Sequence, residues 1–315
     1  MVPSPPMFST NRIVITAALG LAVFLQPHGA GTEASTPVPI VVTIPVLKDL
    51  TEQVGGKHVR VTSLLSGYEN EHTYSPKPTD LVAVRNARLL IEIGVGLEVW
   101  VSSLVRTAGS HTLRVVTTSQ GVELIRDEAD SHNDHQVADT GHGSQGNPHI
   151  WLDPVNVLIM LQHITEALIE IDPDHASEFR SNHAAYREQL AHLQHELSGR
   201  TQQLADRRFI AHHSAWPYLA RRFDFHIADT IHLQSGTEPS ARHLQSIIHK
   251  VRKENVKVIA SEIQLSQRLP ELLSRETRAR VVVLTTMTGG VPGTETYLDM
   301  LRYNVLQLVG ALETR

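Results

Sequence analysis

Histidine is the residue type that stands out in this chain of 315 residues. There are 19 histidines and no cysteine, so imidazole nitrogens are the main donors that the chain can offer to a borderline metal ion. Imidazole also titrates near neutral pH, which makes its charge easy to change. A high count does not make a site, so the positions of the histidines must decide whether they act together.

Three histidines lie where a parallel sheet binds its ligands. His72 comes shortly after a predicted strand at 59–65, and His213 comes directly after one at 208–211. His149 lies between an acidic loop and a long helical stretch. Ligands of doubly wound sheets bind beyond the carboxyl ends of the strands. We therefore expect these imidazoles to share a zinc-type site, since zinc typically takes three or four protein ligands in tetrahedral geometry.

His212 competes with its neighbour His213 for a place in this site. Side chains alternate between the two faces of a strand, so only one of the pair should enter the cleft. A single histidine near a strand end is more often a hydrogen-bonded loop residue than a metal ligand. Its position alone does not distinguish these two roles.

Apolar periodicity predicts strands that alternate with helices. Such alternation is typical of βαβ units and a parallel sheet. The helix at 176–204 would be about 45 Å long at 1.5 Å per residue, long enough to run the length of a two-lobed protein. The expected strands are 40–44, 59–65, 89–93, 208–211, 257–261 and 280–284, and the expected helices are 47–54, one opened by Pro78, a stretch from Asp153 that Pro173 interrupts, 176–204, 215–222, 240–254, 269–275 and 297–312.

The fold class predicted from this order is α/β, with two Rossmann-like lobes of parallel sheet joined by one long rigid helix. The expected boundaries are a signal peptide at 1–34, an N-terminal lobe at 35–173, a linking helix at 174–205 and a C-terminal lobe at 206–315.

The N-terminus and the net charge restrict where the protein works. An apolar run at 13–25 follows Arg12 and is too short to span a bilayer comfortably, which is typical of a cleavable secretory signal. Without cysteine there is no lipobox, so we expect a free periplasmic protein and not a lipoprotein. A net charge of −5 gives no electrostatic support for a nucleic-acid partner.

Several sequence runs resemble one family over nearly the whole mature chain. The strongest are 71–80 (EHTYSPKPTD), 147–154 (NPHIWLDP) and 213–223 (HSAWPYLARRF), with weaker ones at 236–240 (GTEPS) and 297–304 (YLDMLRYN). In this order they resemble the zinc/manganese solute-binding proteins of ABC importers, the cluster A-I or zinc-uptake family. The resemblance implies that His72, His149 and His213 bind metal, that a membrane permease is the partner, and that no reaction is catalysed. We also expect a monomer.

The fourth ligand departs from the family pattern. The family usually has a carboxylate after the last strand of the C-terminal lobe, where this chain has Thr285 and Thr286. Neutral hydroxyls bind zinc poorly. Glu71 beside His72 is the first substitute, and water and Glu262 are the others.

Other functions remain open at this stage. The carried metal could be Mn²⁺, although manganese sites prefer more oxygen ligands than this chain offers. Some relatives have been described as metal-dependent adhesins. Three histidines with an open position could also serve a zinc hydrolase, but the chain has no His-Glu-x-x-His helix.

The segment 127–148 interrupts the α/β pattern. It is rich in acids and contains His132, His135 and His142, and zinc-uptake members often carry a loop of this kind. We expect these histidines to bind metal weakly beside the main site. Deleting 127–142 should therefore remove the weak zinc equivalents bound by this loop, measured by calorimetric titration, and leave the tight equivalent. Loss of the tight equivalent would contradict this separation.

Overall fold

The computed structural model describes residues 1–4, 6–7, 36–126, 146–233 and 237–313. Thr36–Arg315 forms one compact unit and Met1–Ser35 a separate one. The apolar run at 13–25 on which the predicted signal peptide rests lies outside the described residues, as do the loop histidines His132, His135 and His142.

The first sheet consists of parallel strands in the order β2-β1-β3-β4. Its register sets Ile40 opposite both Val61 and Leu89. These apolar partners place the middle of the sheet in the core. The strands are β1 (Val38–Val42), β2 (Val59–Ser63), β3 (Leu89–Glu92) and β4 (Arg114–Thr117), and the helices of this half are α1 (Pro45–Gly55), α2 (Pro78–Asn86) and α3 (Val101–Ala108).

The second sheet repeats this plan in the order β6-β5-β7-β8, again with parallel strands. In both sheets the first strand in sequence lies between the second and the third. The strand order therefore reverses beside β1 and beside β5, which is where such sheets bind ligands. The strands are β5 (Arg208–His213), β6 (His226–His232), β7 (Val258–Glu262) and β8 (Arg280–Leu284), with helices α6 (Pro217–Phe223), α7 (Ala241–Glu254) and α8 (Arg268–Thr277).

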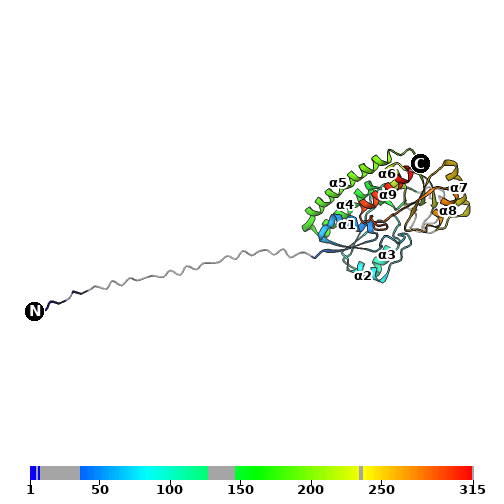
Figure 1. Cartoon of the computed structure of the whole chain (residues 1–315). Coiled ribbons are helices and arrows are strands. Elements are labelled where there is room, and N and C mark those ends of the chain that lie inside the picture. The colour runs from blue at the N-terminus through cyan, green and yellow to red at the C-terminus, as the bar shows by residue number, and fades with distance from the viewer. Residues whose placement is uncertain (5, 8–35, 127–145, 234–236, 314–315) are drawn as a thin grey trace. The chain divides into compact units, whose positions relative to one another are not determined.

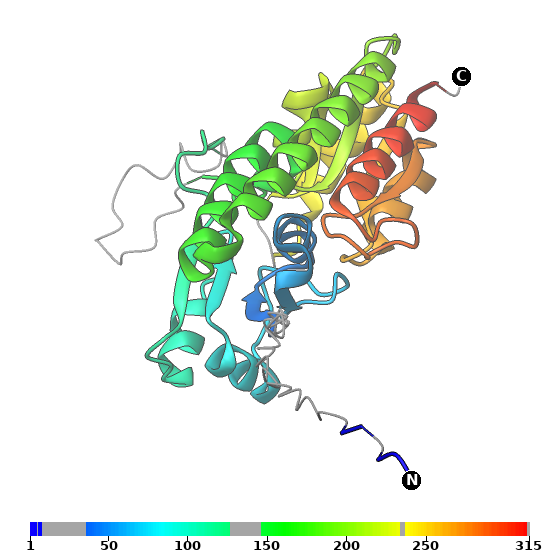
Figure 2. The same cartoon turned by 90° about the vertical axis from the view of Figure 1, so that its left-hand side faces the viewer.

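Three further helices pack together beside the sheets (Figure 1). The long helix α5 contacts α1, α4 and α9, and Figure 2 shows α5 and α9 side by side. At the start of α4, the Asp153 side chain accepts a hydrogen bond from the backbone of Val155 and pairs with Arg222 of α6 at 2.7 Å. The helices are α4 (Pro154–Ile171), α5 (Ala176–Thr201) and α9 (Tyr297–Glu313), and the short 3₁₀ turns are η1 (Gly56–His58), η3 (Ile150–Leu152) and η4 (Pro173–His175).

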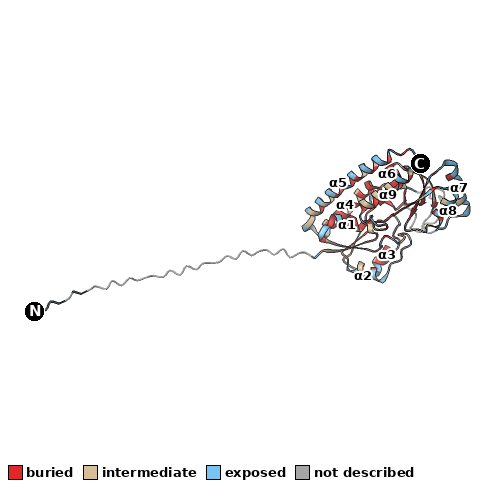
Figure 3. Cartoon of the chain, in the orientation of Figure 1, coloured by how far each residue is buried: buried red, intermediate tan, exposed pale blue. Residues whose placement is uncertain are grey.

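The buried apolar residues form one large core that runs through both sheets. It joins side chains of β1, β3 and β5 with the inner faces of α4, α5 and α9. A smaller core lies between the second sheet and the helices α7 and α8. Figure 3 shows the same division, with buried residues inside and exposed residues along the outer faces of α5 and α7.

Within the described residues, α4 is the helix that is long and apolar enough to cross a membrane. Half of its 18 residues are buried in the protein, and it packs against α1 and α5. We therefore assign it to the core of the folded unit.

The structure confirms the predicted α/β class, the parallel sheets and the long helix, which ends at Thr201 and not at 204. Three elements were not predicted: α3, β4 and β6. Both missed strands lie at sheet edges and are largely half-buried or exposed, so they lack the continuous apolar run of a central strand. The strands of each sheet fall within one predicted lobe, but the lobe boundaries themselves stay a prediction.

Candidate metal site

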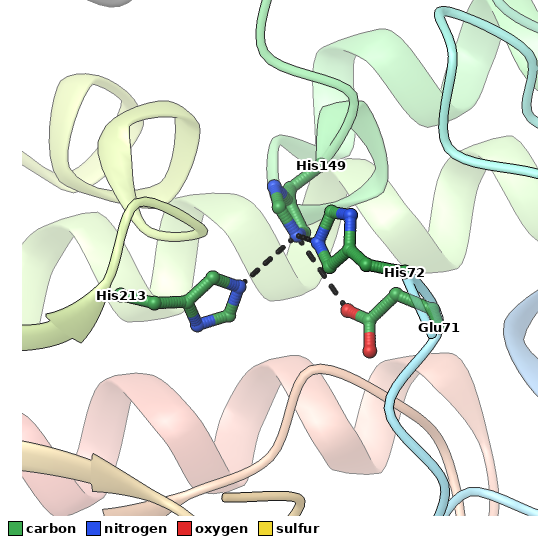
Figure 4. Close-up of side chains that lie close together, drawn as sticks. All are labelled: Glu71, His72, His149 and His213. Atoms are coloured by element: carbon green, nitrogen blue, oxygen red, sulfur yellow. Dashed lines mark hydrogen bonds and ion pairs between the residues drawn. The ribbon is translucent and has the colours of Figure 1, made fainter. Parts of the chain in front are cut away.

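Glu71, His72, His149 and His213 come together in the folded chain (Figure 4). One ligand atom from each lies within 4.8 Å of all the others. The Nε2 atom of His149 is 3.0 Å from Nε2 of His72, 3.2 Å from Nε2 of His213 and 3.5 Å from Oε1 of Glu71. Three nitrogens and one carboxylate oxygen thus face the same small volume.

The four side chains come from three loops or strand ends. Glu71 and His72 lie in the turn between β2 and α2, where the His72 backbone donates to the Asn70 side chain. His149 directly precedes η3, and His213 is the last residue of β5. The site therefore collects residues from the carboxyl ends of strands in both sheets, as expected for this topology.

The His149 ring is held from behind by Asn147. The Asn147 amide nitrogen donates to the carbonyl of Ser214, so its oxygen faces His149 and accepts from both the His149 backbone and Nδ1 at 2.9–3.0 Å. Because Nδ1 carries the proton of this hydrogen bond, Nε2 of the neutral ring keeps its lone pair. That lone pair points into the group of four.

The His213 ring is held in the same way by Glu262. Nδ1 of His213 lies 2.7 Å from a Glu262 carboxylate oxygen, which also accepts from the His213 backbone and from Nε1 of Trp216. Burial by itself would raise the pKa of Glu262, but His213 and these hydrogen bonds bring it below its ordinary value. A carboxylate behind a ligating imidazole fixes its tautomer and makes it a better donor.

The distances between donors match a tetrahedral zinc ion. Zinc–nitrogen bonds of 2.0–2.1 Å place two tetrahedral ligands about 3.3–3.4 Å apart. The separations of 3.0 and 3.2 Å around His149 are close to this edge length. A cation between His149 and His213 would bind to the Nε2 atoms of both rings.

Burial favours the neutral form of two of the imidazoles. It lowers the pKa of His72 to about 3, with a further contribution from His149, and it lowers the pKa of His149 well below its ordinary value. A metal must displace a proton from a charged imidazole before it can bind. At neutral pH these two rings carry no such proton.

Glu71 is the carboxylate that completes the group. Its side chain is buried, and within the described residues no hydrogen bond reaches its Oε1 atom. A buried carboxylate oxygen that lacks a partner is costly. A cation held by the three imidazoles would relieve this cost, which distinguishes Glu71 from a solvated loop acid.

The threonines at the usual carboxylate position serve the surrounding structure. Thr285 accepts from Gln264 and donates to the carbonyl of Met287, while the Thr286 carbonyl accepts from Nε1 of Trp151. The Thr286 hydroxyl is buried and has no hydrogen-bond partner among the described residues, but a neutral hydroxyl is a poorer zinc ligand than the Glu71 carboxylate.

His212 lies on the opposite face of β5 from His213, as strand alternation predicts. It is fully buried, and its Nδ1 accepts from the Glu262 backbone at 3.2 Å. The residues that sequence reasoning missed are Asn147 and Trp216 in their supporting roles. Two features could have indicated these roles. One is the Asn147-Pro148-His149 run, and the other is that His213 and Glu262 end neighbouring strands.

The sequence model of the family described as "Zinc-uptake complex component A periplasmic" matches residues 40–311. The chain belongs to this zinc-uptake family. Its members are metal-binding solute-binding proteins of transport systems.

Several relatives and solved structures resemble the chain. A protein of Treponema pallidum (strain Nichols) described as metal-binding is 28% identical over 310 residues, covering 96% of this chain and 97% of that protein. The high-affinity zinc uptake system protein ZnuA of Bacillus subtilis (strain 168) is 25% identical over 90% of each chain. A crystal structure of ZnuA superimposes with a TM-score of 0.77 at 29% identity, over 88% of this chain and all of that one.

The depressed histidine pKa values make the metal-free fold of this family member sensitive to acid. Unfolding returns each ring to a pKa near 6.5, so below this pH the unfolded chain binds more protons and stability falls as pH falls. The slope is about 1.4 kcal/mol per pH unit for each such ring. His72→Gln should therefore reduce the loss of stability between pH 7 and 5, measured by denaturant unfolding with chelator present. The exposed His226→Gln is the control, and an unchanged slope in the His72 variant would contradict the assignment.

Proposed function

We propose that this protein captures Zn²⁺ outside the cytoplasm and delivers it to an ABC importer. The observation that supports this most directly is the convergence of three imidazole nitrogens and one buried carboxylate oxygen on one small volume. Two of the imidazoles have their lone pairs directed inward by Asn147 and Glu262. In this proposal zinc is the transported ion, and its ligands are Glu71, His72, His149 and His213.

The donor set favours zinc over manganese. Three nitrogens and one oxygen suit a tetrahedral zinc ion, whereas Mn²⁺ prefers more oxygen ligands and a higher coordination number. Among the solved structures, a ZnuA deletion mutant with zinc bound is 28% identical to this chain, with a TM-score of 0.77, over 89% of this chain and all of that one.

We further propose that the site does no catalysis. A zinc hydrolase keeps an open metal position for water and a base beside it. Here Glu71 takes the fourth position in the proposed site. The second carboxylate, Glu262, is fully buried and engaged by His213 and Trp216, so it is poorly placed to act as a base.

The partner in this proposal is the membrane permease of the importer, and the protein acts in the periplasm as a monomer without a lipid anchor. The family description names a periplasmic component of an uptake complex. Some relatives differ: the chain spans 60% of the length of the zinc-binding lipoprotein AdcA of Streptococcus pneumoniae (strain ATCC BAA-255 / R6), at 26% identity.

His149→Ala and His213→Ala should each lower zinc affinity by more than about 100-fold, since changes to residues that only support a ligand already cost 10–100-fold. Competition with a chelating dye measures the affinity. His226→Ala, which removes an exposed histidine of β6, should bind like the unchanged chain. Tight binding that survives in both site variants would exclude this site.

The identity of the fourth ligand can be tested with a matched pair of variants. Glu71→Gln keeps the shape of the side chain and removes its charge, so zinc affinity should fall by at least about tenfold. Thr286→Val removes a buried hydroxyl at the usual carboxylate position and should leave affinity unchanged. The reverse pattern would assign the fourth position to the threonine loop.

A further inference from the structure

A second group of metal-ligand side chains lies at the other end of α4. His58 ends η1, Asp172 directly precedes η4, His175 ends η4, and Glu178 lies in the first turn of α5. His149 precedes the amino end of α4 and Asp172 follows its carboxyl end. Because α4 has 18 residues, about 27 Å of helix separates the two groups.

The side chains of this group already interact in pairs. Nε2 of His58 lies 2.8 Å from a carboxylate oxygen of Glu178, and Nδ1 of His175 lies 2.7 Å from one of Asp172. The two imidazole rings stack with their centres 3.7 Å apart. One ligand atom each from His58, Asp172 and His175 lies within 4.8 Å of the other two.

Burial and charge suit a cation that enters from solvent. His58 is buried and packs edge-on against the ring of Phe179, so it offers a fixed nitrogen. The side chains of Asp172, His175 and Glu178 are partly exposed, so an ion can reach them. The group contains two carboxylates, and among the described residues one ammonium pairs with it, that of Lys57 at 3.7 Å from Glu178.

We propose that His58, Asp172, His175 and Glu178 form a second, weaker site for a divalent cation of the zinc class. Two imidazoles and two carboxylates are donors that zinc accepts. The stacked rings cannot both direct a lone pair at one ion, so binding turns the partly exposed His175 ring out of the stack. The bound ion then ties η1 to η4 and the start of α5. This proposal does not rest on the function assigned to the first site.

The test uses the full chain loaded with one equivalent of Zn²⁺ and then titrated with further Zn²⁺ by calorimetry. His175→Ala should bind one equivalent less in this second phase. Glu178→Gln, which keeps the size of this partly exposed side chain, should weaken the same equivalent by at least about tenfold. His192→Ala, which removes an exposed histidine of the same helix, should keep the stoichiometry of the unchanged chain and so controls for weak binding by surface and loop histidines.

Unchanged second-phase binding in both His175→Ala and Glu178→Gln would overturn the second site, as would an equal loss in His192→Ala. The two proposals fail separately. If the unchanged chain binds no zinc tightly but loses a weak equivalent in His175→Ala, the transport function is wrong and the second site stands. If only the tight equivalent exists, the transport function stands and the second site is wrong.

Discussion

The fold holds Nε2 of His149 and Nε2 of His213 3.2 Å apart, close to the spacing of two ligands on one tetrahedral zinc ion. Asn147 holds one ring from behind and Glu262 holds the other. Neither ring can rotate without losing a buried hydrogen bond. The structure therefore keeps its donors aligned before any ion arrives, so that little reorganisation accompanies cation binding.

These supports depend in turn on the sheets. Parallel pairing of β5 with β7 sets Ala211 opposite Ala260, and two residues further along the same register brings His213 beside Glu262. Trp216, in the turn after β5, adds a third donor to that carboxylate. A fully buried charge of this kind is tolerated because several donors surround it. The orientation of one ligand is thus a consequence of strand register.

The sequence predicts which histidines form the site, but it does not predict the hydrogen bonds that orient them or the edge strands of the sheets. His72 follows a strand, His213 ends one and His149 directly precedes a helical turn, so topology brings them together. The roles of Asn147 and Glu262 depend on hydrogen-bond directions across strands and loops, which sequence spacing does not encode. The edge strands β4 and β6 escaped prediction because half-buried edges carry mixed polarity. Glu71 could be named as a candidate, but only its burial without a hydrogen bond to Oε1 separates it from an ordinary loop acid.

The large core that runs through both sheets also governs how fast an ion can come and go. Swinging one sheet away from the other would expose apolar area on α4, α5 and α9, at about 2.5 kcal/mol for each 100 Å². Moving the short turn that carries Glu71 and His72 exposes far less. Exchange should therefore proceed through local loop opening, with the donors setting the equilibrium affinity and this turn setting the residence time. A partner that pulls on the turn could then accelerate release without separating the two halves of the protein.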